Sequence, residues 1–173
     1  MNATTVKKII RDIPDFPQKG VIFKDITPIL KDPAVYRFVI DTLTGILKPV
    51  SFDAIVGIES RGFMFGTALA YQMKKAFVPV RKKGKLPYRT VQMSYALEYG
   101  EAVVEMHEDA IKKDDRVVIV DDLLATGGTA LAAAQLVEKL GGKVEKYAFV
   151  IELLFFKGRE KLSAYDVDSL VQF

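Results

Sequence analysis

Cysteine is missing from the sequence and histidine occurs once, as His107, and both facts exclude classes of site. Without cysteine the chain forms no disulfides and no thiolate metal centres, a composition that suits a reducing compartment. With one histidine it holds neither a histidine-cluster metal site nor a catalytic histidine pair. The glutamates that flank His107 are not spaced as metal ligands, so we expect His107 to be a solvated residue near a strand end.

Long apolar runs and a large charge of one sign are also missing. The longest apolar run, residues 147–156, is interrupted by Glu152 and falls well short of the ~20 residues that a membrane-spanning helix needs. The N-terminal residues lack the apolar core of a signal peptide. A formal net charge of +3 is too small to indicate nucleic-acid binding. We therefore expect a cytoplasmic protein that binds neither a membrane nor a nucleic acid.

What the sequence does contain is an alternation of apolar strands with helices. We expect strands at residues 54–58, 77–80, 116–120, 144–154 and 169–171, and helices at 33–47, 63–73 and 129–140. Asp32 as N-cap and Pro33 at the first helical position mark the start of the first long helix. The alternation predicts an α/β fold, a doubly wound, mainly parallel sheet with flanking helices. The 173 residues are expected to form a single domain with a sizeable core.

Two segments stand outside this alternation and are expected as attachments to the domain. The first, residues 1 to about 34, is expected to form a small N-terminal hood that begins with a helix over 4–11, capped by Thr4. The second, residues 81–106, is expected to form a flexible loop and a β-hairpin around a glycine turn.

Residues 117–129 combine a buried strand, two carboxylates and an anion site. Four apolar β-branched residues lead into Asp121 and Asp122, and a glycine-rich turn and an alanine-rich helix follow. Gly127 and Gly128 let backbone amides approach a ligand closely, and the positive end of the helix favours a phosphate. The two acids suit the vicinal hydroxyls of a sugar or the waters of a magnesium ion. The stretch therefore predicts a sugar-phosphate site.

Other nucleotide-binding motifs do not fit this loop. It contains no Gly-Lys-Ser/Thr sequence, which excludes a Walker A loop, and it lacks the Gly-x-Gly-x-x-Gly fingerprint of dinucleotide-binding folds. Thr126 and Thr129 add hydroxyl donors that suit a phosphate. The alternative, an acidic flank before an ordinary helix with a Gly-Gly turn, stays open at this point.

A second group of residues suits another anion. Arg61 follows one predicted strand and precedes a helix, so its guanidinium is placed to form paired hydrogen bonds with phosphate oxygens. Lys82 and Lys85 lie in a basic loop that contains glycine and proline. Because open α/β sheets bind ligands at the carboxyl ends of their strands, Arg61 is expected near Asp121. The alternatives are a surface arginine for Arg61 and, for the basic loop, a solvated run of charges or a nucleic-acid patch.

The segment from Val120 to Thr129 resembles the phosphoribosyl pyrophosphate (PRPP) motif of the type I phosphoribosyltransferases. The resemblance covers nearly the whole chain, and the adenine-specific members of the family are the most similar. The stretches that carry it are 16–28, 59–63, 81–87, 94–100 and 120–129. The resemblance implies conversion of adenine and PRPP to AMP and pyrophosphate in purine salvage, by a homodimer that requires Mg²⁺. The metal is implied to arrive with PRPP, near Asp121 and Asp122, and not to be held directly by the protein.

The same resemblance implies a role for individual residues. The phosphate and ribose are implied to lie on Asp121, Asp122, Ala125, Thr126, Gly127, Gly128 and Thr129. Pyrophosphate is implied to contact Glu59, Ser60, Arg61, Lys82 and Lys85, with a cis peptide between Glu59 and Ser60. The loop that carries the lysines is implied to close over the site and exclude water.

Adenine recognition and proton transfer complete the implied site. Adenine is implied to meet backbone groups of Ile22 and Lys24, between Phe23 on one face and Leu153 on the other. Many family members have arginine where this chain has Lys24, a change that backbone recognition tolerates. Arg61 and Glu98 are the implied catalytic residues, Glu98 as the acid–base group at the purine with Tyr99 beside it in the flexible loop. Core packing for Phe23 and Leu153, and a solvated hairpin position for Glu98, are the alternatives.

Two other functions remain open on the sequence. One is the same reaction on another purine base, such as hypoxanthine or xanthine. The other is a regulatory protein that keeps the fold and the PRPP site as a sensor, although the chain lacks the strongly basic face expected of a nucleic-acid-binding regulator.

Overall fold

The computed structural model describes residues 1–96 and 101–173. In this part of the chain seven strands form a central sheet in the order β5-β6-β4-β3-β7-β8-β9. The parallel strands are β3 (Ala54–Ile58), β4 (Ala76–Lys82), β7 (Arg116–Leu124), β8 (Lys143–Glu152) and β9 (Val167–Gln172). At one edge β6 (Glu101–His107) runs antiparallel to β4 and to β5 (Thr90–Ala96). The predicted α/β fold with a mainly parallel sheet is confirmed.

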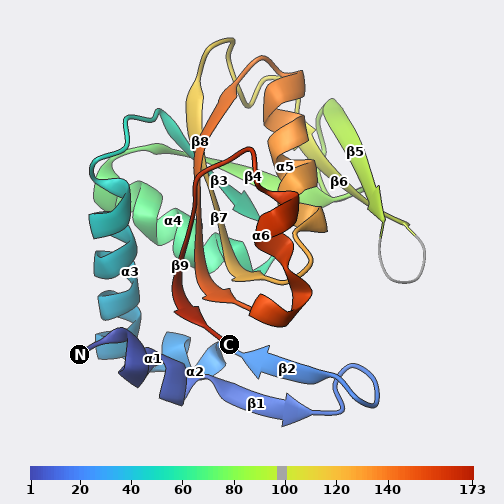
Figure 1. Cartoon of the computed structure of the whole chain (residues 1–173). Coiled ribbons are helices and arrows are strands. Elements are labelled where there is room, and N and C mark those ends of the chain that lie inside the picture. The colour runs from blue at the N-terminus through green and yellow to red at the C-terminus, as the bar shows by residue number, and fades with distance from the viewer. Residues whose placement is uncertain (97–100) are drawn as a thin grey trace.

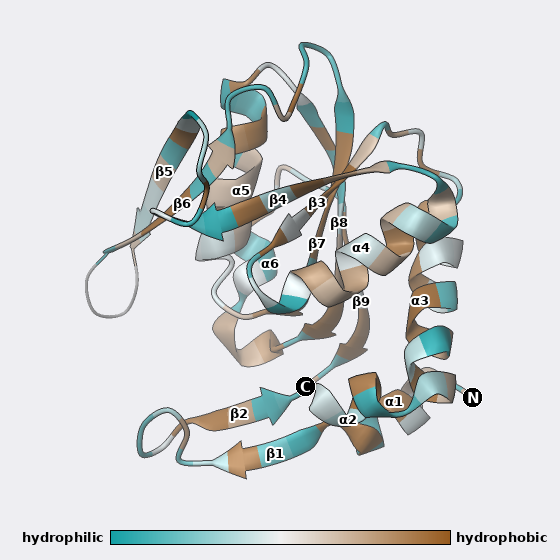
Figure 2. Cartoon of the chain, turned by 180° about the vertical axis from the view of Figure 1, so that it is seen from behind, coloured by the Kyte–Doolittle hydropathy of each residue, from teal (hydrophilic) through white to brown (hydrophobic). Residues whose placement is uncertain are grey.

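Helices cover both faces of this sheet (Figure 1). Successive strand residues point to opposite faces and pack into two separate hydrophobic cores. Ile55 of β3 packs with α3 (Pro33–Leu47) and α4 (Arg61–Met73), whereas the next residue, Val56, packs with α5 (Gly128–Lys139). All of β3 is buried, as expected for a parallel strand covered on both sides. Figure 2 shows the hydrophobic colour along these central strands and the hydrophilic colour on outer loops and helix faces.

The helix boundaries follow from capping residues. The Asp32 carboxylate accepts hydrogen bonds from the amides of Ala34 and Val35, at 2.9 and 3.2 Å, and Pro33 occupies the first turn of α3. These contacts confirm the predicted start of the helix. At the N-terminus the prediction of Thr4 as cap is wrong. Asn2 caps α1 (Ala3–Ile9), because its side chain accepts from the Thr5 amide at 3.0 Å.

The N-terminal segment forms its own two-stranded sheet beside the main one (Figure 1). Strand β1 (Arg11–Pro14) pairs antiparallel with β2 (Ile22–Asp25), and the short helix α2 (Thr27–Lys31) leads into α3. Lys24 joins the two strands of this hairpin through an ion pair with Asp12 at 2.7 Å, and it contacts the rest of the domain at Phe173, whose ring centroid lies 3.8 Å from its ammonium.

Tertiary pairing makes β4, β7 and β9 longer than the sequence pattern predicts. β7 continues through the two acids because Asp121, Leu123 and Leu124 keep their pairing with β8, so Asp121 and Asp122 lie inside the strand and not in the loop. β4 continues to Lys82, which pairs with Val104 of β6. The 3₁₀ turn η1 (Leu154–Phe156) and the helix α6 (Gly158–Lys161) were not expected from the sequence.

His107 lies at the end of β6, as predicted, but it is half-buried and not fully solvated. β6 pairs His107 with Thr90, and Tyr88 lies edge-on to the imidazole with the ring centroids 5.9 Å apart. The Nε2 atom is shielded from solvent and has no hydrogen-bond partner among the described residues. Within the same ranges, no helix is long and apolar enough to cross a membrane.

Candidate active site

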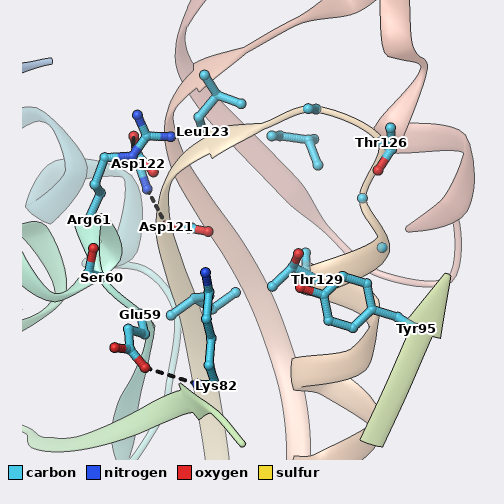
Figure 3. Close-up of a pocket in the computed structure, with 16 residues that line it drawn as sticks. Glu59, Ser60, Arg61, Lys82, Tyr95, Asp121, Asp122, Leu123, Thr126 and Thr129 are labelled. Atoms are coloured by element: carbon cyan, nitrogen blue, oxygen red, sulfur yellow. Dashed lines mark hydrogen bonds and ion pairs between the residues drawn. The ribbon is translucent and has the colours of Figure 1, made fainter. Parts of the chain in front are cut away.

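The predicted site residues gather where β3 and β7 end and where α4 and α5 begin (Figure 3). The predicted phosphate and ribose residues, together with Glu59, Ser60, Arg61 and Lys82, line a cavity of about 270 Å³. Its walls are Ile58, Glu59, Ser60, Arg61, Lys82, Tyr95 and all residues from Asp121 to Ala130. Both helices direct their N-terminal amides and positive dipole ends at this cavity, which favours an anionic ligand.

Residues 125–129, here called the phosphate loop, form the far wall of the cavity. Gly127 has a φ of +77°, and a Cβ on it would lie 2.8 Å from the carbonyl oxygen of Gly158. A Cβ on Gly128 would lie 3.2 Å from the Tyr95 ring. Glycine is therefore required at Gly127, for the turn and for the close approach to Gly158, whereas a side chain at 128 would crowd the Tyr95 ring. No side chain caps α5, so its first amides remain available to a ligand.

Asp121 and Asp122, the acid pair, lie at the base of the cavity. The Asp122 amide donates to Oδ1 of Asp121 at 2.8 Å, and the Asp122 side chain is 4% exposed. Burial raises the pKa of both carboxyls, and the charge of Asp122 adds to the rise at Asp121. The Arg61 guanidinium opposes the rise at Asp122. Two desolvated acids of like charge favour a cation or hydroxyl donors beside them.

Arg61 joins the acid pair to the N-terminal hairpin. It is the first residue of α4 and follows a cis peptide between Glu59 and Ser60, which confirms the expected cis bond. Its Nε lies 2.9 Å from Oδ2 of Asp122, and its Cζ lies 4.8 Å from the ring centroid of Phe23. The helix start approaches β7 closely, since a Cβ on Gly62 would lie 2.8 Å from Oδ1 of Asp121.

Glu59 holds strand β4 and does not point a free carboxylate at a ligand. It accepts hydrogen bonds from Nε and Nη2 of Arg81, at 3.2 and 3.0 Å, and from the Lys82 amide at 2.9 Å. Burial alone would raise the pKa of Glu59, but these hydrogen bonds outweigh it and hold the pKa below its usual value. A contribution of Glu59 to anion binding therefore acts through Arg81 and Lys82.

Two further cavities adjoin the first, and Arg61 lines all three. One, of about 440 Å³, is bordered by Phe23, Glu59, Ser60, Arg61, Lys82 and Lys85. The other, of about 500 Å³, is mostly apolar and is here called the apolar pocket; its walls include Ile22, Phe23, Lys24, Leu123, Ala125, Leu153, Phe155, Phe156 and Phe173. The Leu153 amide donates to the Leu124 carbonyl at 2.9 Å, which fixes this pocket next to the acid pair.

The structure thus brings together every predicted site residue in the described ranges, whereas Glu98 and Tyr99 lie outside them. Sequence reasoning missed Arg81, Tyr95 and Gly158. Arg81 belongs to the basic run before Lys82, and Tyr95 belongs to the stretch that carried the family resemblance, so both had a signal. Gly158 had none, because its contact with the phosphate loop spans about 30 residues of chain.

Comparison with known proteins agrees with this geometry. The phosphoribosyl transferase domain family matches residues 26–171. The adenine phosphoribosyltransferase of Thermosipho melanesiensis is 55% identical over 168 residues, which span 97% of this chain and 96% of the relative. The crystal structure of the Thermoanaerobacter pseudethanolicus enzyme superposes with a TM-score of 0.98 at 52% identity, covering 99% of this chain and 100% of the other.

A third relative was crystallised with ligands. The Saccharomyces cerevisiae adenine phosphoribosyltransferase, complexed with an imino-altritol bisphosphate and adenine, has a TM-score of 0.92 and 43% identity over 98% of both chains. The resemblance seen in the sequence is confirmed over nearly the whole chain. The chain therefore belongs to the phosphoribosyl transferase domain family and, within it, to the adenine phosphoribosyltransferases.

Proposed function

We propose that this chain converts adenine and PRPP to AMP and pyrophosphate in purine salvage. The observation that carries the proposal is the meeting of three different cavities at Arg61. One combines the phosphate loop with the acid pair, one is bordered by two lysines, and one is apolar and aromatic. A sugar phosphate, a departing pyrophosphate and a purine need these three environments, and they need them side by side.

The ligand is placed by matching each group to its environment. The 5′-phosphate lies on the amides and hydroxyls of the phosphate loop, and the ribose hydroxyls donate to the acid pair. Pyrophosphate lies between Arg61, Lys82 and Lys85, with the Ser60 hydroxyl beside it. Adenine enters the apolar pocket between Phe23 and Leu153, where the backbone of Ile22 and Lys24 reads its edge. The anomeric carbon then lies where the cavities meet.

Transfer breaks the bond from the anomeric carbon to pyrophosphate and forms one to the purine nitrogen. Pyrophosphate leaves with the bonding electrons, so cations placed around it stabilise the transition state. The sugar gains oxocarbenium character, and the negative charge of the acid pair stabilises this developing positive charge. Adenine loses a proton, and Glu98 is the proposed acceptor. Binding both reactants beside Arg61 supplies proximity and orientation.

The acid pair also fits the Mg²⁺ that the family resemblance implies. Among residues 1–96 and 101–173 no group of three or more potential ligands is placed to hold a metal ion. Mg²⁺ keeps several waters and takes one or two carboxylates together with substrate phosphates, so an ion that arrives with PRPP suits Asp121 and Asp122. When bound, Mg²⁺ supplies positive charge against the pyrophosphate oxygens.

Assembly and location are further parts of the proposal. We infer a homodimer in the cytoplasm, with no membrane or nucleic acid as partner. The absence of cysteine suits the reducing cytoplasm, the small net charge argues against a nucleic-acid partner, and the membership in the family supports the homodimer. Sedimentation of the purified chain measures its assembly: a monomer at micromolar concentration would exclude the dimer.

The test of the activity is AMP formation by the purified chain from adenine, PRPP and Mg²⁺, followed by chromatography. Adenine, hypoxanthine and xanthine are then compared by kcat/KM. A higher value for hypoxanthine or xanthine would assign the enzyme to another base. Tight PRPP binding by calorimetry without AMP formation would instead favour the regulatory sensor.

A further inference from the structure

Glu105 of β6 is a buried carboxylate that none of the steps above uses. It is 2% exposed. Among the described residues, the two other buried acids each have an arginine partner: Asp122 pairs with Arg61, and Glu152 with Arg159. Glu105 forms no ion pair in the same ranges. A buried carboxylate is costly unless it is hydrogen-bonded. The neutral groups that donate to Glu105 therefore indicate which segment of the chain it stabilises.

Those donors are mainly backbone amides of one turn. Oε1 of Glu105 accepts from the amides of Lys85 and Leu86, both at 3.0 Å. Oε2 lies 3.3 Å from the Thr90 hydroxyl and 3.4 Å from the Gln92 amide group. The stronger contacts therefore converge on the segment 82–86, here called the lysine turn, in which Gly84 has a φ of +83°.

A second carboxylate holds the same turn from the other side. Nη1 of Arg81 donates to the Lys85 carbonyl at 2.9 Å, while Nε and Nη2 of Arg81 donate to Glu59. Both polar groups of the Lys85 backbone are therefore fixed, the amide by Glu105 and the carbonyl by Arg81. The strand register explains the arrangement, because β6 places Glu105 directly opposite Arg81.

The choice of partners preserves the charge of the turn. Glu105 binds amides and no ammonium group, and Lys82 and Lys85 form no ion pair within the described ranges. Both lysines border the cavity that also contains Arg61. A carboxylate close to a lysine-rich segment thus shapes its backbone and leaves its positive charge for an anionic ligand.

We propose that Glu105 is a positioning residue for pyrophosphate, which fixes the backbone of Lys85 so that its ammonium is aimed at the leaving group before PRPP binds. The proposal rests on the function proposed above and adds to it a residue that touches neither substrate. Preorganisation of this kind lowers the ordering cost that a long, flexible lysine side chain would otherwise impose on binding.

The first experiment replaces Glu105 by glutamine, which keeps the size and removes the charge. We expect Glu105→Gln to raise the KM for PRPP by about ten-fold, through the loss of charge-assisted hydrogen bonds, with little change in the KM for adenine. Glu105→Asp keeps the charge, and its KM for PRPP is expected to fall between those of the original chain and Glu105→Gln. It also replaces Glu105→Gln in the test if the glutamine variant does not fold. Glu108→Gln, an exposed glutamate just beyond β6, is the matched control and should change neither constant.

A double-mutant cycle then asks whether Glu105 acts through Lys85. In a Lys85→Ala background, Glu105→Gln should raise the KM for PRPP less than two-fold, because the lysine it positions is gone. In a Lys83→Ala background the full effect should remain, since Lys83 borders none of the three cavities. Full additivity with Lys85→Ala, or an equal rise in the KM for adenine, would overturn the proposal. So would a loss of thermal stability with both KM values unchanged.

The proposal and the underlying function fail in different ways. If the unmodified chain makes no AMP, the function is wrong, but pyrophosphate affinity measured by calorimetry still tests Glu105. Weaker pyrophosphate binding by Glu105→Gln, absent in the Lys85→Ala background, would support the positioning role. Equal affinity of the original chain and Glu105→Gln for pyrophosphate would exclude it.

Discussion

Gly158 and Gly45 provide a paired prediction, because the same added methyl group should have opposite effects at the two positions. Gly158, the first residue of α6, packs against the phosphate loop: a Cβ on it would lie 2.1 Å from the carbonyl oxygen of Ala125. Gly45 lies exposed in α3, and a Cβ there would meet no atom within 4 Å. One substitution therefore forces a clash with backbone, and the other fills open space.

The magnitude follows from that contact. Real Cβ atoms do not approach a heavy atom closer than 3.0 Å, so Gly158→Ala must separate α6 from the phosphate loop by about 1 Å. The atom it meets is a backbone oxygen, which cannot rotate away as a side chain can. Overpacking of this kind costs about 1–3 kcal/mol of folding free energy. A misplacement of about 1 Å also costs an active site on the order of 100-fold in rate.

We therefore expect Gly158→Ala to lower the denaturant midpoint, weaken AMP binding and reduce kcat/KM by roughly 100-fold. Gly45→Ala should raise the free energy of unfolding by about 0.5–1 kcal/mol, because alanine favours a helix over glycine, and it should leave AMP affinity unchanged. Urea unfolding and calorimetry with AMP measure both. Unchanged AMP affinity in Gly158→Ala would refute the idea that α6 supports the phosphate loop.

Three further outcomes follow from the ion pairs. Arg61→Ala should lower kcat/KM by roughly 1,000-fold, which steady-state kinetics would detect. It should also destabilise the fold, because it leaves the buried Asp122 carboxylate without its cation, and thermal unfolding would detect that loss. Asp122→Asn in the Arg61→Ala background should recover part of the melting temperature but none of the turnover, whereas Asp122→Asn alone with undiminished PRPP affinity would contradict the ribose assignment. Hydrogen bonds from Arg159 outweigh burial and hold the pKa of Glu152 below its ordinary 4.5. The contribution of Glu152 to stability is therefore complete above about pH 4.5 and is lost as the pH falls further. Urea midpoints of the original chain and of Glu152→Gln, measured between pH 3 and 7, should converge at the acidic end.

The features that the sequence predicted are those whose cause is local. Asp32 and Pro33 start α3 through contacts within a few residues, and the glycines of the phosphate loop follow from the turn they occupy. The order of strand, acids, glycines and helix predicted where the cavity at the end of β7 lies. Local chemistry was enough for these features because the acids, the glycines and the helix start follow one another along the chain, although Arg61 and Tyr95 complete the cavity from other elements.

The features that escaped prediction depend on pairing between distant segments. β7 extends through the acid pair because β8 lies beside it, and His107 is half-buried where β6 pairs with β5 and Tyr88 approaches its ring. Glu105 is the clearest example, because its hydrogen bonds to the lysine turn depend on the strand register that places it opposite Arg81. The position of this glutamate between Val104 and Met106, in an apolar strand, nevertheless indicates a buried carboxylate that needs hydrogen-bond partners.

The two halves of the site therefore differ in how they are built. The acid pair and the phosphate loop lie on one continuous stretch of chain, which β8 and Gly158 support from outside. The proposed pyrophosphate side is assembled from Arg61, the lysine turn and the carboxylates of Glu59 and Glu105, which are joined by hydrogen bonds through Arg81, Lys82 and Lys85. A substitution in the first half should act on ligand contacts directly, whereas one in the second should act through a neighbour. Coupling energies should accordingly be larger between Glu105 and Lys85 than between any residue of the lysine turn and the phosphate loop.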